Sequence, residues 1–195
     1  MKKIALQLKT KQFLNFIDCW SDVYKDLSLW KKFLFFSWML PNNLFAFVFA
    51  SIVIGFIRDQ ENSSFTRFKD CLLVSISKDS LFWRNRSVCL GSIIISPKDS
   101  SQEILLHEYG HSLQSQRLGP LYFLIIGLPS LIRATRYSCF PSCFSRYSFG
   151  HCKTDSKYSY FHCFVEAWAD HLGGVYARHE HKFKDYREYF WRELF

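Results

Sequence analysis

Hydrophobic side chains recur three or four residues apart from position 13 to position 30, with Lys and Asp between them. This spacing fits one face of an α-helix, and the acidic residues on the polar side favour packing on a core over lying on a membrane surface. The hydrophobic positions are Phe13, Phe16, Ile17, Trp20, Val23, Leu27 and Trp30. The pattern therefore predicts an amphipathic helix over 13–30 and indicates no function.

A run of 25 residues, 33–57, then has no charged side chain. Pro41, Asn42 and Asn43 interrupt it, which leaves 44–57 as the unbroken part. A helix of that length rises about 21 Å, less than the roughly 30 Å hydrocarbon layer of a bilayer. We therefore expect a helical, apolar segment over about 11–57, with contact to a membrane and burial in a core both left open.

A second apolar run, 118–132, has the same ambiguity. Glycines and prolines interrupt it, at positions 119, 120, 127 and 129. Such residues kink or break a spanning helix unless neighbouring groups satisfy the freed backbone polar atoms. Contact with a membrane and burial in a globular core therefore both remain alternatives for this run as well.

Two stretches before the middle of the chain predict β-structure. Residues 71–76 form a short strand pattern between charged turns, and 88–95 form a buried strand or a two-strand piece with Gly91 at a bend. The second stretch ends just before the motif described next. Its edge is a place where an extended peptide can pair by adding a strand, while a plain interior strand is the alternative.

The string His107-Glu108-Tyr109-Gly110-His111 is the one stretch whose residue types and spacing indicate a specific chemistry, metal binding with a neighbouring general base. Residues four apart on a helix lie one turn above each other, so His107 and His111 can hold one metal ion between them. Glu108 points to the neighbouring flank, where a general base takes a proton from a metal-bound water. Zinc suits a site of two imidazoles and one carboxylate.

Independent signals place this string on a helix over about 101–117. Ser100 and Glu103 fit a capping box, in which the serine receives an amide hydrogen bond and the glutamate reaches back. Gly110 removes a side chain beside the histidines and allows another element or a substrate to approach closely.

A second helical pattern over about 161–173 contains Glu166 and Asp170 on one face, and Gly173 and Gly174 mark its end. Two histidines leave a catalytic zinc one protein ligand short, and Glu166 can supply the third from a facing helix. Asp170 can accept the outer N–H of a ligand histidine and fix its tautomer. The alternative is a surface glutamate and an aspartate without function.

Length, composition and charge indicate the domain organisation and the classes of partner. A chain of 195 residues with 49% hydrophobic residues predicts one domain, 1–195, with a substantial core. The formal charge of +8 is scattered along the chain, so nucleic-acid binding is not favoured. The sequence does not predict an oligomeric state.

The seven cysteines are an odd number, which argues against a complete disulfide framework. The apolar run at the start is lost at Gln7 and Lys9, so we expect no secretory signal peptide and a cytoplasmic or membrane-associated protein. Residues 133–160 predict a long loop. Its Cys139, Cys143 and Cys152, like Cys163 beyond it, fit incidental thiols better than a structural zinc site.

The string HEYGH followed by E-A-W-A-D resembles the gluzincin class of zinc metallopeptidases. The segments WMLPNN, LGSIII, HEYGHSLQSQRLGPLYFLIIGLPS and EAWADHLGG resemble small bacterial HExxH proteins, over about half the chain. The resemblance implies an α+β, mostly helical, zincin-like fold with a small sheet before the active-site helix. It implies His107, His111 and Glu166 as Zn²⁺ ligands, Glu108 as general base and Asp170 as a supporting residue.

These expectations converge on a zinc-dependent metallopeptidase that hydrolyses a peptide or protein substrate by Glu108-assisted attack of water. Four side chains are candidates to stabilise the oxyanion, without discrimination: Tyr109, Tyr160, His162 and His171. The alternative is a non-catalytic, zinc-stabilised, membrane-associated scaffold or binding protein.

Overall fold

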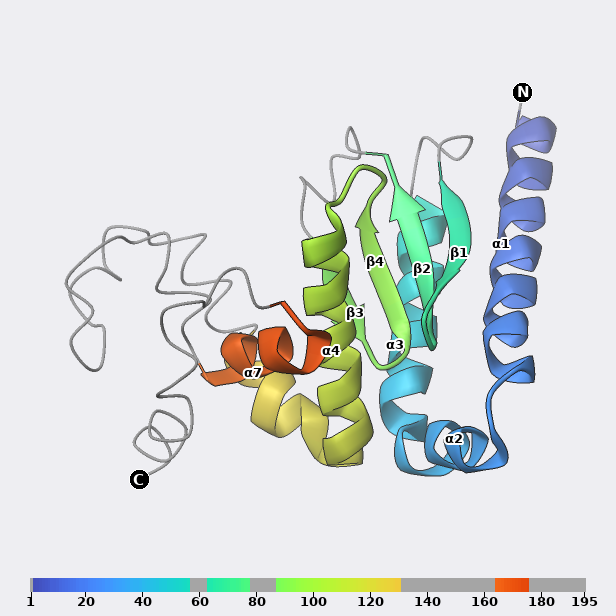
Figure 1. The fold of residues 1–195 in the computed structure, drawn as a ribbon. Coiled ribbons are helices and arrows are strands. Elements are labelled where there is room, and N and C mark those ends of the chain that lie inside the picture. Colours follow the sequence, from blue (N-terminus) through green and yellow to red (C-terminus); the bar gives the residue numbers. More distant parts are fainter. Residues whose placement is uncertain (1, 57–62, 78–86, 131–163, 176–195) are drawn as a thin grey trace, which may run out of the picture.

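The structure is a computed structural model that describes residues 2–56, 63–77, 87–130 and 164–175. Within these residues the chain combines helices with one small mixed sheet, as the α+β prediction requires (Figure 1). The helices are α1 (Lys2–Lys25), α2 (Leu29–Phe33), α3 (Leu40–Phe56), α4 (Gln102–Leu118) and α7 (Phe164–Gly173), with short turns η1 (Leu34–Trp38), η3 (Gly119–Leu121) and η4 (Phe123–Gly127). The strands are β1 (Ser64–Phe68), β2 (Cys71–Ile76), β3 (Val88–Leu90) and β4 (Ile93–Pro97).

The sheet has the order β1-β2-β4-β3. Two antiparallel hairpins, β1–β2 and β3–β4, join through the parallel pairing of β2 with β4. The prediction of a strand over 71–76 is confirmed, and 88–95 is the two-strand piece, with Gly91 at the bend in the left-handed region (φ 55°). Of these two strands, β4 lies inside the described sheet and β3 forms its edge.

Both faces of the sheet are covered, because alternate residues of β2 and β4 point to opposite sides. Leu72, Val74 and Ile76 share a cluster with residues of α1 and α3. Cys71, Leu73 and Ile94 pack instead against α4, through Leu105 and Tyr109. All residues of β2 and β4 are buried, as expected for strands between two helical layers.

The first helix differs from its prediction at both ends. It begins before residue 13 and ends at Lys25, because Ser28 accepts a hydrogen bond from the Lys31 amide and starts the separate helix α2. Phe16 and Val23 are buried as expected. The sequence pattern also places Trp30 on this buried face, but Trp30 lies on α2 and is 67% exposed.

The break in the uncharged run lies earlier than predicted. Pro41 falls in the first turn of α3, where proline is tolerated because its missing N–H has no helical partner, and the helix continues through Asn42 and Asn43. The interruption is instead the π-helical turn η1. The second run, 118–132, breaks at Gly119, where α4 ends, and its last residues, 131 and 132, lie outside the described part.

No helix in the described ranges is by itself long and apolar enough to cross a membrane. The pair Leu29–Trp38 and Leu40–Gly55 meets the same criteria of length and composition when taken together, with a bend of 76° between its members.

The two asparagines at the start of α3 connect three parts of the fold. Asn43 accepts a hydrogen bond from the Ser92 amide (3.0 Å) in the β3–β4 turn. Asn42 donates to the Ser115 hydroxyl and to the Gly119 carbonyl, both at 2.7 Å, at the end of α4. The sequence segments WMLPNN, LGSIII and HEYGHSLQSQRLG therefore meet in space.

Candidate metal centre

Helix α4, which carries the HExxH string, has its N-cap one residue later than the predicted capping residue Ser100. Its N-cap is Ser101, whose hydroxyl accepts a hydrogen bond from the Ile104 amide at 3.4 Å. The predicted cap, Ser100, is instead engaged by Ser96, whose hydroxyl donates to that of Ser100 at 2.6 Å. The predicted helix is thus correct apart from its capping residue.

Helices α4 and α7 cross at two glycines (Figure 1). A Cβ atom at Gly110 would overlap the backbone carbonyl of Ala169, and one at Gly173 would overlap the carbonyl of Leu106. The element that Gly110 was expected to admit is therefore α7. This close crossing brings Glu166 over the two histidines of α4.

The ligand atoms of His107, His111 and Glu166 lie within 4.8 Å of one another, a group that can hold a metal ion. One carboxylate oxygen, Oε2 of Glu166, lies 3.1 Å from Nε2 of His107 and 3.3 Å from Nε2 of His111. All three side chains are buried. Both imidazoles therefore present the same type of nitrogen to the same point.

Each of the three side chains also makes a hydrogen bond through the polar atom that points away from the other two. Nδ1 of His107 lies 2.6 Å from Oδ1 of Asp170, the contact that the sequence predicts. Nδ1 of His111 lies 2.8 Å from Oε1 of Gln114, and Ser130 donates to Oε1 of Glu166 at 2.7 Å. A second partner of this kind fixes the tautomer and orientation of a metal ligand.

Gln114 and Ser130 are the supporting residues that the sequence reasoning missed. A signal existed for Gln114, because it follows His111 by three positions and so lies on the same side of α4. Its amide also donates to the Val165 carbonyl at 2.7 Å, which ties α4 to α7. For Ser130 no spacing rule applies, since it comes from the segment after η4.

The charges of the group are strongly coupled. Burial lowers the pKa of His107, but hydrogen bonds with Asp170 and Glu166 outweigh it and raise this pKa to about 10. Burial raises the pKa of Glu166, but the hydrogen bonds from His107 and His111 outweigh it and hold this pKa far below its usual value. Without a metal, a positive His107 and a negative Glu166 are therefore the stable charge states.

Glu108 is buried beside this group on the same helix. Burial raises the pKa of its carboxyl, while the nearby His107 and His111 and a hydrogen bond from the Cys89 backbone oppose the rise. The last contact connects Glu108 to β3, the edge strand of the described sheet. A carboxyl with a raised pKa is a better proton acceptor than one in water.

Family models, curated proteins and solved structures were compared with the chain, and none matches it.

Of the four candidates for an oxyanion partner, the structure describes Tyr109 and His171. Tyr109 packs with Phe68 and under the ammonium of Lys69, 4.4 Å from its ring centroid, on the sheet side of α4. His171 lies exposed on α7. Tyr160 and His162 lie outside the described residues, as do Cys139, Cys143, Cys152 and Cys163.

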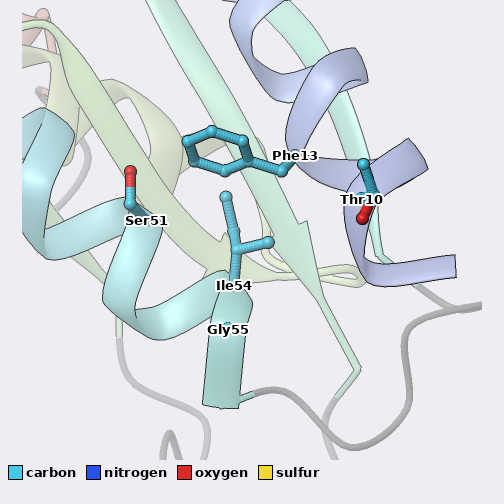
Figure 2. Close-up of a pocket in the computed structure, with 5 residues that line it drawn as sticks. All are labelled: Thr10, Phe13, Ser51, Ile54 and Gly55. Carbon is cyan, nitrogen blue, oxygen red and sulfur yellow. The ribbon is translucent and has the colours of Figure 1, made fainter. Parts of the chain in front are cut away.

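A pocket of about 300 Å³ lies between α1 and α3, away from these residues (Figure 2). Its lining is mainly apolar and comes from Thr10, Phe13, Ser51, Ile54 and Gly55. The Ser51 hydroxyl already donates to the Phe47 carbonyl at 2.7 Å. None of the candidate metal ligands lines this pocket.

Proposed function

We propose that the chain is a zinc-dependent metallopeptidase whose metal is held by His107, His111 and Glu166. The observation that carries the proposal is the convergence of two imidazole nitrogens on one carboxylate oxygen, with a buried glutamate next in sequence to the first histidine. Two nitrogens and a carboxylate form a donor set used by catalytic zinc, which keeps its fourth position open. The outer contacts of all three residues support this assignment.

Zinc in such a site lowers the pKa of water and polarises a carbonyl group. The protein supplies the rest of the chemistry. Glu108 takes the proton from the attacking water and delivers it to the leaving amine, a role that its raised pKa suits. Asp170 and Gln114 accept hydrogen bonds from Nδ1 of His107 and His111, so the Nε2 atoms, which face Glu166, are the nitrogens that would bind the metal once it displaces their protons.

The substrate class, a peptide or protein, follows from the resemblance of the HEYGH and EAWAD strings to gluzincins. The fold that this resemblance implies, a zincin-like arrangement, is part of the same proposal. The small sheet before α4 and the glutamate on α7 agree with it in order along the chain.

The direct test replaces Glu108 by Gln. We expect Glu108→Gln to bind as much zinc as the unchanged protein, because no ligand is lost, and to cleave a peptide library at least about 100-fold more slowly, because the general base is gone. Zinc is measured by elemental analysis and cleavage by mass spectrometry.

The matched control is Glu103→Gln, an exposed glutamate in the first turn of the same helix. It should change neither zinc content nor cleavage. Undiminished cleavage by Glu108→Gln would remove Glu108 from the mechanism. Equal zinc in Glu166→Ala and in the unchanged protein would refute the three-ligand site.

A second candidate function is a membrane-associated scaffold in which the same zinc site only stabilises the fold. The exposed hydrophobic side chains of α2 and α3 favour it, since a peptidase does not need them. Chelation separates the two functions. Loss of the fold on chelation, with no cleavage of any peptide by the zinc-loaded protein, would favour the scaffold.

A further inference from the structure

One end of the molecule exposes an unusual number of large hydrophobic side chains. We call it the apolar end and define it by α2, η1, the first half of α3, and η3 with η4. Its members are Leu29, Trp30, Phe33, Phe36, Trp38, Leu40, Leu44, Phe45, Leu121, Leu124, Ile125 and Leu128, each between 42% and 85% exposed. A soluble monomer rarely exposes so large a group of apolar side chains without a partner for it.

These elements are neighbours in space although about 80 residues separate them along the chain. Figure 1 shows α2 at the same end of the molecule as the last turns of α4 and the yellow segment that follows α4. Phe45 of α3 meets Phe123 of η4 with ring centroids 5.0 Å apart. The Trp38 ring fills the space beside Gly119, so η1 and the start of α3 adjoin the segment that follows α4.

We infer that the apolar end binds the surface of a lipid bilayer and inserts these side chains among the acyl chains. This inference does not rest on the proposed peptidase function. A bilayer fits better than a protein partner because, apart from Lys31 and Lys32 of α2, the apolar end has no charged residue. No residue of 33–56 or 118–130 is charged, whereas protein interfaces normally carry many hydrogen bonds.

The borders of this surface fit the interface between water and lipid. Trp30 and Trp38 are both exposed at it, and tryptophan prefers the headgroup region, where an apolar ring with one polar atom suits both sides. Lys32, which lies between Trp30 and Phe33 on α2, and the exposed Arg117, which precedes Leu118, match anionic headgroups in charge, while Lys31 is paired with Asp70.

The backbone is also compatible with insertion. The exposed hydroxyl of Ser37 donates to the Phe33 carbonyl inside its own turn, so it brings no unsatisfied group into lipid. The helix pair on either side of Met39 is bent by 76° and long and apolar enough, taken together, to meet the criteria for a membrane segment. Such a bend lets both helices dip into one leaflet.

The test is co-flotation of the full chain with vesicles of phosphatidylcholine containing phosphatidylglycerol. The variants are Phe33→Glu on α2 and Leu124→Glu on η4, at side chains 59% and 66% exposed, where a charge is tolerated in water. We expect the unchanged protein to float with the vesicles and each variant to lose about tenfold or more of its binding, because a charge must be buried in lipid. The control Leu14→Glu, on the exposed side of α1 (54%), should float like the unchanged protein.

Thermal unfolding and zinc content are recorded for every variant, so that loss of binding is not confused with loss of fold. Leu124→Ser is the milder substitution if Leu124→Glu unfolds. Absence of flotation, or equal flotation of all variants, would refute the inference. So would a dimer in solution that Leu124→Glu dissociates while no protein floats, since the partner would then be a second copy of the chain. Peptide cleavage by a protein that does not float would leave the proposed function intact.

Discussion

At the level of single residues, Gln114 supports the His111 imidazole in the same way as Asp170 supports the His107 imidazole. Each accepts a hydrogen bond from Nδ1 of an imidazole whose Nε2 faces Glu166. The two supporting residues come from different helices, so the proposed metal ligands are held by α4 and α7 together. Ser130 adds a third support, to the carboxylate of Glu166.

We predict that Gln114→Ala lowers zinc affinity by about 10- to 100-fold, the usual effect of removing the outer partner of a ligand histidine. Gln114→Glu keeps an acceptor for Nδ1 but cannot donate to Val165, so it should regain most of the affinity and not all of the stability. Affinity is measured by competition with a chromophoric chelator. The control is Gln116→Ala, two positions later on the same helix. An equal loss of affinity in both alanine variants would contradict the role of Gln114.

Residue chemistry was predictable as far as it followed spacing. His107 and His111 follow from the helical repeat, and the structure places Glu166 and Asp170 beside them as predicted. Ser130 could not be predicted, because its position depends on how the chain folds back after α4. The prediction of Ser100 as the N-cap is wrong. Ser100 and Ser101 both fit the capping pattern, and only the structure shows that Ser101 is the cap.

At the level of elements, the candidate metal centre depends on how closely α4 and α7 approach each other. Gly110 and Gly173 face the backbone of the opposite helix without an intervening side chain. The distance between the helix axes is therefore limited by main-chain atoms. A shift of either helix would move Glu166 away from both imidazoles at once.

We predict that Gly110→Ala destabilises the fold by about 1–3 kcal/mol, the usual cost of overpacking, although alanine favours a helix by nearly 1 kcal/mol over glycine. It should also lower zinc binding, because α7 must move. The matched control is Gly55→Ala near the end of α3, where an added Cβ meets nothing within 4 Å. Gly55→Ala should leave stability unchanged or raise it. Chemical denaturation and elemental analysis measure both effects, and full zinc binding by Gly110→Ala would contradict the prediction.

Helices and strands could be predicted where hydrophobic residues recur at a regular spacing along the segment. Strand β2 and helix α4 match their predicted ranges closely. The prediction of a break at Pro41 is wrong, because a proline in the first turn of a helix and a proline that ends a helix look alike in sequence. The π-helical turn before it has no sequence signature that would have shown the true break.

At the level of the whole molecule, the buried group of His107, Glu166 and Asp170 contributes to stability even without a metal. The raised pKa of His107, about 10 against 6.5, means that its pairing with Asp170 and Glu166 is fully present below pH 6.5 and is lost as pH rises through 10. The lowered pKa of Glu166 means that its contribution is present above 4.5 and is lost only as pH falls below that value. The metal-free fold therefore gains most from this group at mildly acidic pH.

Zinc must displace the proton of His107, so its effect on stability should depend on pH. We predict that the rise in melting temperature on adding zinc is larger at about pH 8 than at about pH 6, because protons compete less at the higher pH. Thermal unfolding with zinc and with a chelator at both pH values measures this. His107→Ala should abolish most of the zinc effect at both pH values, because a proposed ligand is lost. A larger effect of zinc at the lower pH would contradict the prediction.

The order of the sheet has a consequence for how the chain is made. The hairpins β1–β2 and β3–β4 are local and can form as soon as each is synthesised, and they then join along the parallel β2–β4 pairing. Helix α4 follows β4 directly, but Glu166 comes 55 residues after His111. These residues must still be synthesised after His111 before Glu166, the proposed third ligand, is available. If the group holds a metal, the complete site can therefore form only after the sheet and α4 have had time to fold.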